Sequence, residues 1–161
     1  MTTSMVPNLW FDGDAEQAAE FYTSVFPNSS IDNVMHTPDG SVVVVEFTLD
    51  GNRFAGINGG PMFTFSEAIS FAIATADQAE ADRYWDALTA DGGQESQCGW
   101  LKDRYGLSWQ VYPAQLGNLL GDPDPLRAQA AHAAMMQQRR IDLAEIRAAA
   151  DAASASQGGP S

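Results

Sequence analysis

The chain has few of the residues that build disulfides, metal centres and anion-binding surfaces. Cys98 is its only cysteine, so no disulfide can form within the chain, and a small, half-buried apolar role suits it better than that of a nucleophile. Eight basic residues stand against 21 acidic ones, for a formal net charge of −13, and Lys102 is the only lysine. Nucleic-acid and anionic-membrane surfaces need clustered basic residues, so we expect neither partner.

Long apolar runs are also missing. No stretch approaches the length that spans a membrane, and residues 1–4 lack the basic and apolar segments of a secretory signal, so we expect a cytoplasmic protein. The acidity is best explained by solvation of the surface. At 161 residues and 45% hydrophobic content, the chain can bury the core of one compact domain.

What the chain does contain is a repeated segment. Asp14-Ala15-Glu16-Gln17-Ala18 returns in physical type as Asp77-Gln78-Ala79-Glu80-Ala81, 77 − 14 = 63 residues later. In each copy an Asp lies three positions before a Gln or Glu, which is typical of a capping box at a helix start. Apolar residues follow at i, i+3, i+4 and i+7, a spacing that predicts an amphipathic helix packed on a sheet.

Runs rich in β-branched and aromatic residues surround both predicted helices. The predicted strands are 5–11, 31–36, 42–49 and 53–58 around the first helix and 69–75, 99–102 and 108–112 around the second, with a weaker strand near Gln94. Asp39-Gly40 and Asp50-Gly51 are predicted hairpin turns, because an Asp-Gly pair accepts positive φ angles. The order predicts an α+β fold made of two βαβββ modules.

The composition changes at about residue 116. Asp122-Pro123-Asp124-Pro125 predicts a turn and a helix start, and Asp142 with Glu145 predicts a further capping box. We expect a helical C-terminal extension over 116–153 and a disordered tail over 154–161. Apolar side chains of the extension could pack on the parent domain or on a second copy of it, and packing within the chain is favoured.

Three segments carry a resemblance to a known superfamily. They begin with Pro7-Asn8-Leu9-Trp10-Phe11-Asp12-Gly13, Ile57-Asn58-Gly59-Gly60-Pro61 and Gly99-Trp100-Leu101-Lys102-Asp103. With them the chain resembles the vicinal oxygen chelate superfamily of glyoxalase I, bleomycin-resistance proteins and extradiol (dihydroxybiphenyl) dioxygenases. Within it the chain is similar to the PhnB-like group, often labelled 3-demethylubiquinone-9 3-methyltransferase domain. The resemblance implies one domain over 1–115, in which modules at about 4–60 and 66–113 form a cupped mixed sheet around a pocket, commonly in a homodimer.

The resemblance also implies His or Glu metal ligands on the first, fourth, fifth and eighth strands, and here the chain departs from it. The corresponding positions fall at Val6 or Pro7, Asn58, Ala68 and Gln110. Aliphatic groups and neutral amides are poor ligands for a divalent transition metal. We therefore expect no metal and no other cofactor.

Other residues do not rebuild the missing site. Glu46 on the third strand, His36 near a turn and His132 in the tail are too few and too scattered to hold a metal. The methyltransferase label has no support either, because no glycine-rich turn joins a first strand to its helix.

Strand alternation selects the candidate pocket residues. If Leu9 and Phe11 cover the first helix, Asn8 and Trp10 face the pocket. The same reasoning turns Ser70, Ser108 and Gln110 inward. With Asn58 and Trp100 added, the predicted substrate-binding set is Asn8, Trp10, Asn58, Ser70, Trp100, Ser108 and Gln110. Each also has a structural alternative, since amides cap backbone groups and tryptophans pack in cores or dimer interfaces.

Three functions remain open at this stage. The first is binding of a small aromatic or amphiphilic molecule in the cup without a catalytic metal. The second is a metal-independent lyase, isomerase or transferase-type enzyme, in which a desolvated Glu46 is the catalytic acid/base, although this carboxylate can also be inert and face solvent. The third is a dimeric scaffold with a vestigial pocket.

Overall fold

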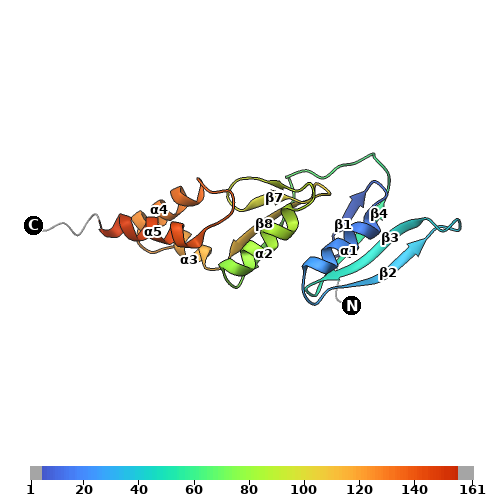
Figure 1. The fold of residues 1–161 in the computed structure, drawn as a ribbon, viewed down its shortest axis with the longest axis horizontal. Helices are drawn as coiled ribbons and strands as arrows, with labels where there is room; N and C mark the ends of the chain where they lie inside the picture. The colour runs from blue at the N-terminus through green and yellow to red at the C-terminus, as the bar shows by residue number, and fades with distance from the viewer. Residues whose placement is uncertain (1–4, 156–161) are drawn as a thin grey trace, which may run out of the picture. The chain divides into compact units, whose positions relative to one another are not determined.

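The computed structural model describes residues 5–155 of the chain (Figure 1). Two compact units make up the chain, Met1–Phe65 and Ser66–Ser161. The first unit contains β1 (Asn8–Phe11), α1 (Ala15–Val25), β2 (Ser30–His36), β3 (Val42–Leu49) and β4 (Asn52–Asn58). The second contains β5 (Phe71–Thr75), α2 (Gln78–Thr89), β6 (Gln94–Glu95), β7 (Trp100–Lys102), β8 (Ser108–Pro113), α3 (Leu116–Leu120), α4 (Pro125–Met135) and α5 (Leu143–Ala155).

Both units build the same four-stranded mixed sheet. The strand orders are β1-β4-β3-β2 and β5-β8-β7-β6, so each module places its first strand beside its fourth. That pair is parallel in both units, and the remaining pairs are antiparallel. The predicted α+β class and the repeated βαβββ module are therefore confirmed.

One helix covers one face of the sheet in each module. In the first, α1 packs through Tyr22 on the ring of Phe47, which in turn stacks on Phe54, with ring centroids 6.2 and 5.6 Å apart. In the second, α2 buries Tyr84 and Trp85. Burying large rings, at about 25 cal/mol per Å² of apolar surface, stabilises these helix–sheet layers.

The two helices start differently, although their sequences look alike. Asp77 accepts a hydrogen bond from the Glu80 backbone N–H at 2.9 Å, and the Glu80 carboxylate accepts the N–H of Ala76, so the second predicted cap is confirmed. Asp14 makes no capping bond through its side chain, and the first predicted capping box is wrong. The N–H of Ala15 is instead bound by Asn58 from β4.

Two strands begin at least two residues later than predicted. β1 starts at Asn8 because Pro7 offers only its carbonyl, which accepts the N–H of Ala55 at 3.0 Å. β5 starts at Phe71 because the preceding segment turns, with the Ile69 N–H bound to the carbonyl of Ser66. The Asp50-Gly51 turn has the expected positive φ angles of 44° and 78°.

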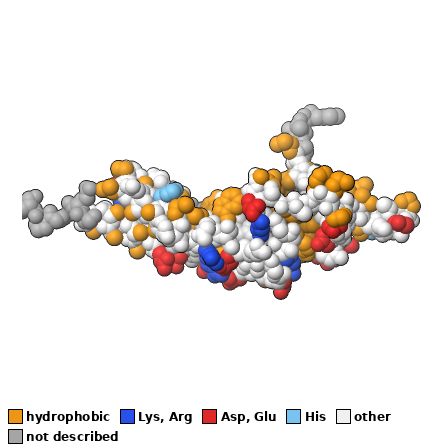
Figure 2. Space-filling view, turned by 90° about the horizontal axis from the view of Figure 1, so that it is seen from above, with side chains coloured by type: hydrophobic (Ala, Val, Ile, Leu, Met, Phe, Trp, Pro, Cys, Tyr) orange, Lys and Arg blue, Asp and Glu red, His pale blue; other side chains and the backbone are white. Residues whose placement is uncertain are grey.

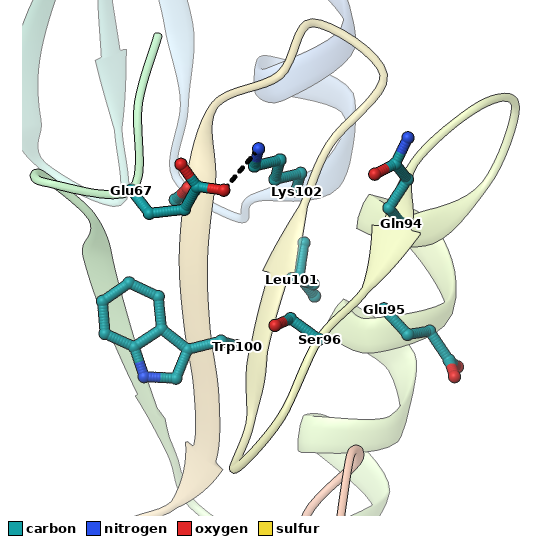
Figure 3. Close-up of a pocket in the computed structure, with 8 residues that line it drawn as sticks. Glu67, Gln94, Glu95, Ser96, Trp100, Leu101 and Lys102 are labelled. Atoms are coloured by element: carbon teal, nitrogen blue, oxygen red, sulfur yellow. Dashed lines mark ion pairs between the residues drawn. The ribbon is translucent and has the colours of Figure 1, made fainter.

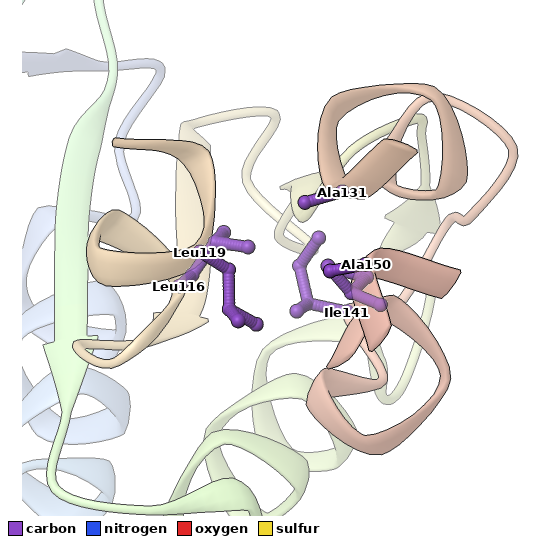
Figure 4. Close-up of a cluster of buried hydrophobic side chains, with 6 residues drawn as sticks. Leu116, Leu119, Ala131, Ile141 and Ala150 are labelled. Carbon is purple, nitrogen blue, oxygen red and sulfur yellow. The ribbon is translucent and has the colours of Figure 1, made fainter. Parts of the chain in front are cut away.

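The C-terminal helices pack on the second module of the same chain. Gln78 of α2 donates to the carbonyl of Ile141 at 2.7 Å and accepts from the N–H of Leu143 at 2.9 Å. Beyond this link lies a separate apolar cluster, shown in Figure 4, made of Leu116, Leu119, Ala131, Ile141, Ile146 and Ala150. The predicted disordered tail overlaps α5 at Ser154 and Ala155, and its remainder lies outside the described residues.

Charged side chains pair across the surface. Figure 2 shows basic side chains lying next to acidic ones on the face drawn. Arg127 bridges Asp122 and Asp151 at 2.9 and 2.8 Å, which ties the start of α4 to α5. Within residues 5–155, no helix has the length and apolar character needed to cross a bilayer.

Candidate functional site

The face of the first sheet that α1 leaves uncovered holds three predicted site residues. Strand register places Asn8 beside Ala55 and Trp10 beside Ile57, while Glu46 lies across from Ala55 on the other side. The half-buried Glu46 carboxylate accepts a hydrogen bond from Asn33 at 3.2 Å. Its role as an acid/base stays a prediction.

Trp10 is held firmly on this face. Its indole N–H donates to the carbonyl of Gly60 at 2.8 Å, and its ring meets Phe63 edge-on at 4.9 Å. A Cβ at Gly59 would lie 2.0 Å from the Trp10 ring, so any other residue there would force the ring to move. Asn8 is exposed and donates to the carbonyl of Val6 at 2.8 Å.

Asn58 does not share this face, and its predicted orientation is wrong. It pairs with Phe11, whose side chain lies under α1, so Asn58 also points to the helix side. Its amide oxygen accepts the Ala15 N–H at 2.9 Å, and its amide nitrogen donates to the carbonyl of Val42 at 3.1 Å. Both halves of the amide are occupied by backbone, which gives Asn58 a structural role.

The second unit contains a cleft of about 130 Å³ on the face of its sheet that α2 leaves uncovered (Figure 3). Trp100 and Lys102 alternate with buried Leu101 along β7, so their side chains share this face. Ser108 pairs directly with Lys102, and Gln94 of β6 pairs with Lys102 on its other side. The residues that line the cleft are Glu67, Gln94, Glu95, Ser96, Trp100, Leu101, Lys102 and Ser108.

The polar side chains in the cleft include a buried hydroxyl and an ion pair. The Ser108 side chain is buried, and its hydroxyl finds no hydrogen-bond partner among residues 5–155. The Lys102 ammonium pairs with the Glu67 carboxylate at 2.5 Å. The hydrogen bond from Lys102 lowers the pKa of the Glu67 carboxyl below its ordinary value, so this carboxylate is ionised at neutral pH.

Ser70 and Gln110 lie together beside the cleft. The Gln110 amide donates to the Ser70 hydroxyl at 2.9 Å, and Gln110 pairs in register with Trp100 and with Ala72. Of the predicted substrate-binding residues, the second unit therefore groups Ser70, Trp100, Ser108 and Gln110 on one sheet face. A substrate contact for any of them stays a prediction.

The loop between β7 and β8 fixes this geometry. Asp103 is 2% exposed, and its carboxylate accepts the backbone N–H groups of Tyr105 and Leu107 and the indole N–H of Trp109. Three hydrogen bonds to one buried carboxylate hold the tight turn between the two strands. Asp103 thereby sets the register that places Lys102 across from Ser108.

Sequence reasoning predicted Trp100 and Ser108 but missed the other residues that line the cleft, which are Glu67, Gln94, Glu95, Ser96, Leu101 and Lys102. Alternation along β7 could have found Lys102, because it lies two positions after Trp100 and so shares its face. Glu67 lies in an irregular segment before β5, where no periodicity indicates which way a side chain points.

A metal centre does not fit the residues present. The part of the chain that the structure describes contains no group of three or more His, Cys, Asp or Glu side chains that could hold an ion. At the positions implied by the resemblance, Asn58 is engaged with backbone and Gln110 with Ser70. Neutral amides are weak metal donors, and the Asn58 oxygen is in addition already occupied by the Ala15 N–H.

Comparisons with known proteins agree with the duplicated module. The fold defines a protein of the vicinal oxygen chelate superfamily, the group of glyoxalase and bleomycin-resistance proteins. More narrowly, residues 3–112 match the model of the 3-demethylubiquinone-9 3-methyltransferase family, so the chain belongs to this PhnB-like family. The PhnB protein from Bacillus cereus is 31% identical, with a TM-score of 0.64 over 70% of this chain and 100% of that one.

More distant structures share the fold alone. Protein PA1353 from Pseudomonas aeruginosa is 18% identical, with a TM-score of 0.54 over 67% of this chain and 95% of that one. The fosfomycin resistance protein FosX from Listeria monocytogenes is 16% identical, with a TM-score of 0.53 over 73% of this chain and 96% of that one. No curated protein matches the chain.

Proposed function

We propose that this PhnB-like protein binds a small aromatic or amphiphilic molecule in the cleft of its second unit, without a bound catalytic metal. The observation that carries the proposal is the position of Trp100, whose half-buried side chain lines the cleft beside Lys102 and Ser108. An aromatic surface next to a few polar groups is typical of small-molecule pockets. The indole offers a stacking face, and the polar groups orient the ligand.

The size of the cleft restricts the ligand. Pockets for drug-sized molecules measure roughly 300–1,000 Å³, whereas this cleft measures about 130 Å³. A single aromatic ring with one polar substituent suits that volume better than a fused ring system. A longer apolar chain would have to leave the cleft and run over the exposed surface.

The donor chemistry supports a function without a metal. FosX from Listeria monocytogenes has also been solved in complex with Mn(II) and sulfate, so a protein of this fold can hold a cation. In the chain described here, the positions expected to bind one carry aliphatic groups or amides. Ligand binding is therefore expected to persist after treatment with a chelator.

The methyltransferase activity in the family's name is not part of the proposal. Each module is a mixed four-stranded sheet with its first strand beside its fourth. A nucleotide-type cofactor site of the Rossmann kind needs a parallel sheet and a glycine-rich turn between a strand and its helix. In the first module the turn from β1 to α1 reads Asp12-Gly13-Asp14, which offers a single glycine.

Calorimetric titration with three single-ring probes tests the proposal. Benzamide, benzoate and phenol are titrated into the full chain before and after dialysis against a chelator. At least one is expected to bind saturably with a Kd of about 1 mM or tighter. Trp100→Ala should weaken that binding at least about tenfold, since stacking and apolar contact are lost together.

Ile69→Ala is the matched control, because Ile69 is an apolar side chain that is 59% exposed and does not line the cleft. It should leave the Kd unchanged. If none of the three probes saturates, or if Trp100→Ala and Ile69→Ala bind equally well, the cleft is not the ligand site and the proposal is wrong.

A homodimer, which is common in the family, belongs to the same proposal. Met62 and Phe63 are 74% and 58% exposed, and a partner chain could cover such apolar side chains. Light scattering on the purified chain is expected to give twice the 17.3 kDa of one copy. A mass of 17.3 kDa would contradict the homodimer. The cytoplasmic location stays a prediction.

A further inference from the structure

We infer that the ligand of this cleft carries a carboxylate or a similar small oxyanion, bound by Lys102 and Ser108, and that Glu67 occupies the place of this group in the unliganded protein. The inference rests on the proposed function, because it concerns the same cleft. It adds the chemical class of the head group and an internal competitor for it.

Lys102 is the cation of the site. It is the only lysine of a chain that carries a formal charge of −13, and its side chain is 34% exposed on the cleft side of β7. The ammonium group carries three donors and no acceptor, so it suits an oxyanion and not a ligand cation. It is two residues from Trp100 on the same face, so one ligand can reach both.

Ser108 supplies the second donor. It lies directly across from Lys102 in the antiparallel pair of β7 and β8, a position where Cβ atoms are about 5 Å apart. The Ser108 residue is 1% exposed, and its hydroxyl has no partner among the described residues. A buried hydroxyl without a partner is uncommon, and an oxygen atom of a ligand would satisfy it.

Glu67 already presents a carboxylate to Lys102. The two groups are 2.5 Å apart, and Figure 3 shows Glu67 directed at the ammonium from the opposite side of the cleft. The Glu67 side chain is 63% exposed and belongs to an irregular segment, so it can leave without disturbing a helix or strand. Exposed ion pairs contribute little to stability, and a ligand carboxylate can therefore replace this one.

The other carboxylate that lines the cleft, that of Glu95, is engaged elsewhere. Glu95 accepts a hydrogen bond from the indole N–H of Trp85 at 2.8 Å, and Figure 3 shows it pointing away from Lys102. Glu67 is thus the acidic group that meets the ammonium, and removing its charge should leave Lys102 open to an external anion.

Benzoate and benzamide test this inference, because they have the same shape and differ in charge. In the wild-type chain, benzoate is expected to bind more tightly than benzamide. Glu67→Gln should tighten benzoate binding about two- to fivefold, in line with the small contribution of an exposed pair, and leave benzamide unchanged. Lys102→Met, which keeps the apolar stem, should abolish the preference for benzoate, and Ser108→Ala should weaken benzoate binding about tenfold.

Asp12→Asn is the matched control, since it removes the same charge from an exposed site in the first unit. It should change neither Kd. If benzamide binds as tightly as benzoate, or if Glu67→Gln and Asp12→Asn act alike on benzoate, the inference is wrong while the proposed function stands. If neither probe binds and phenol also fails, the proposed function itself is wrong, and the inference falls with it.

Discussion

The side chain of Asn58, at the end of β4, accepts the backbone N–H of Ala15, at the start of α1, over a distance of 2.9 Å. The two residues are 43 positions apart in the chain, so a distant strand caps this helix. Asp14, which the sequence predicts as the cap, makes no such bond. The cap of α1 therefore depends on the completed sheet, because β4 must be in place before Asn58 can reach the helix.

Replacing Asn58 should destabilise the first unit. Asn58→Ala removes the cap of α1 and the bond to the carbonyl of Val42, and we expect a loss of about 1–2 kcal/mol in the free energy of unfolding. Asp14→Ala is the natural control and should change it by less than about 0.5 kcal/mol. Urea unfolding followed by circular dichroism measures both, and equal effects would show that Asp14 shares the capping.

Of the acidic residues in the second unit, Asp103 should be the one whose replacement lowers the free energy of unfolding most. In Asp103→Asn an amide N–H₂ would face either the indole N–H of Trp109 or the backbone N–H groups of the loop, which places two donors against each other. We expect a loss of about 2–4 kcal/mol in the free energy of unfolding. The exposed Asp12→Asn should change it little.

A double-mutant cycle separates this bond from a general effect of the substitution. In the Trp109→Phe background no indole N–H remains, so Asp103→Asn should destabilise the protein less than it does in the wild type. Strict additivity of the two substitutions would show that the Asp103–Trp109 bond contributes nothing of its own.

The carboxyl group of Asp39, in the turn between β2 and β3, should titrate at an unusually low pH. The hydroxyl of Thr37 donates to Asp39 and, with the backbone N–H of Ser41, lowers the pKa of Asp39 from 3.8 to about 2. A carboxyl with a lowered pKa in the folded state stabilises the fold above pH 3.8, and this contribution disappears as the pH falls through about 2. Carboxyl carbon NMR should show the titration, and Thr37→Val should move it toward 3.8.

An unchanged Asp39 titration in Thr37→Val would contradict the assigned cause. Thr23→Val serves as the control, because the Thr23 hydroxyl bonds to backbone carbonyls within α1 and does not contact a carboxylate.

The local sequence pattern was enough to predict the repeated elements of the fold. β3 has the bounds that its β-branched run predicts, and the Asp77 cap acts within its own helix, so neighbouring residues decide both. The face of Asn58 could not be found this way. It lies at the end of its strand, and its direction is set by pairing with Phe11, a contact between segments far apart in sequence.

The same distinction applies to the candidate site. Alternation placed Ser108 and Gln110 on one face of their strand, and the register of β7 with β8 adds Trp100 to that face. The ion pair of Lys102 with Glu67 depends on the path of an irregular segment, which side-chain periodicity does not encode. The unsatisfied hydroxyl of Ser108 is a property of packing and appears only in three dimensions.

The most direct test of the central claim is an NMR titration of the ¹⁵N-labelled chain with benzamide and benzoate. Saturable shifts are expected at the indole N–H of Trp100 and at the amides of Lys102 and Ser108, which line the cleft. The indole signals of Trp85 and Trp109, whose N–H groups bond to Glu95 and Asp103, should move little. Shifts that do not saturate, or that leave Trp100 unmoved while other regions respond, would contradict the account.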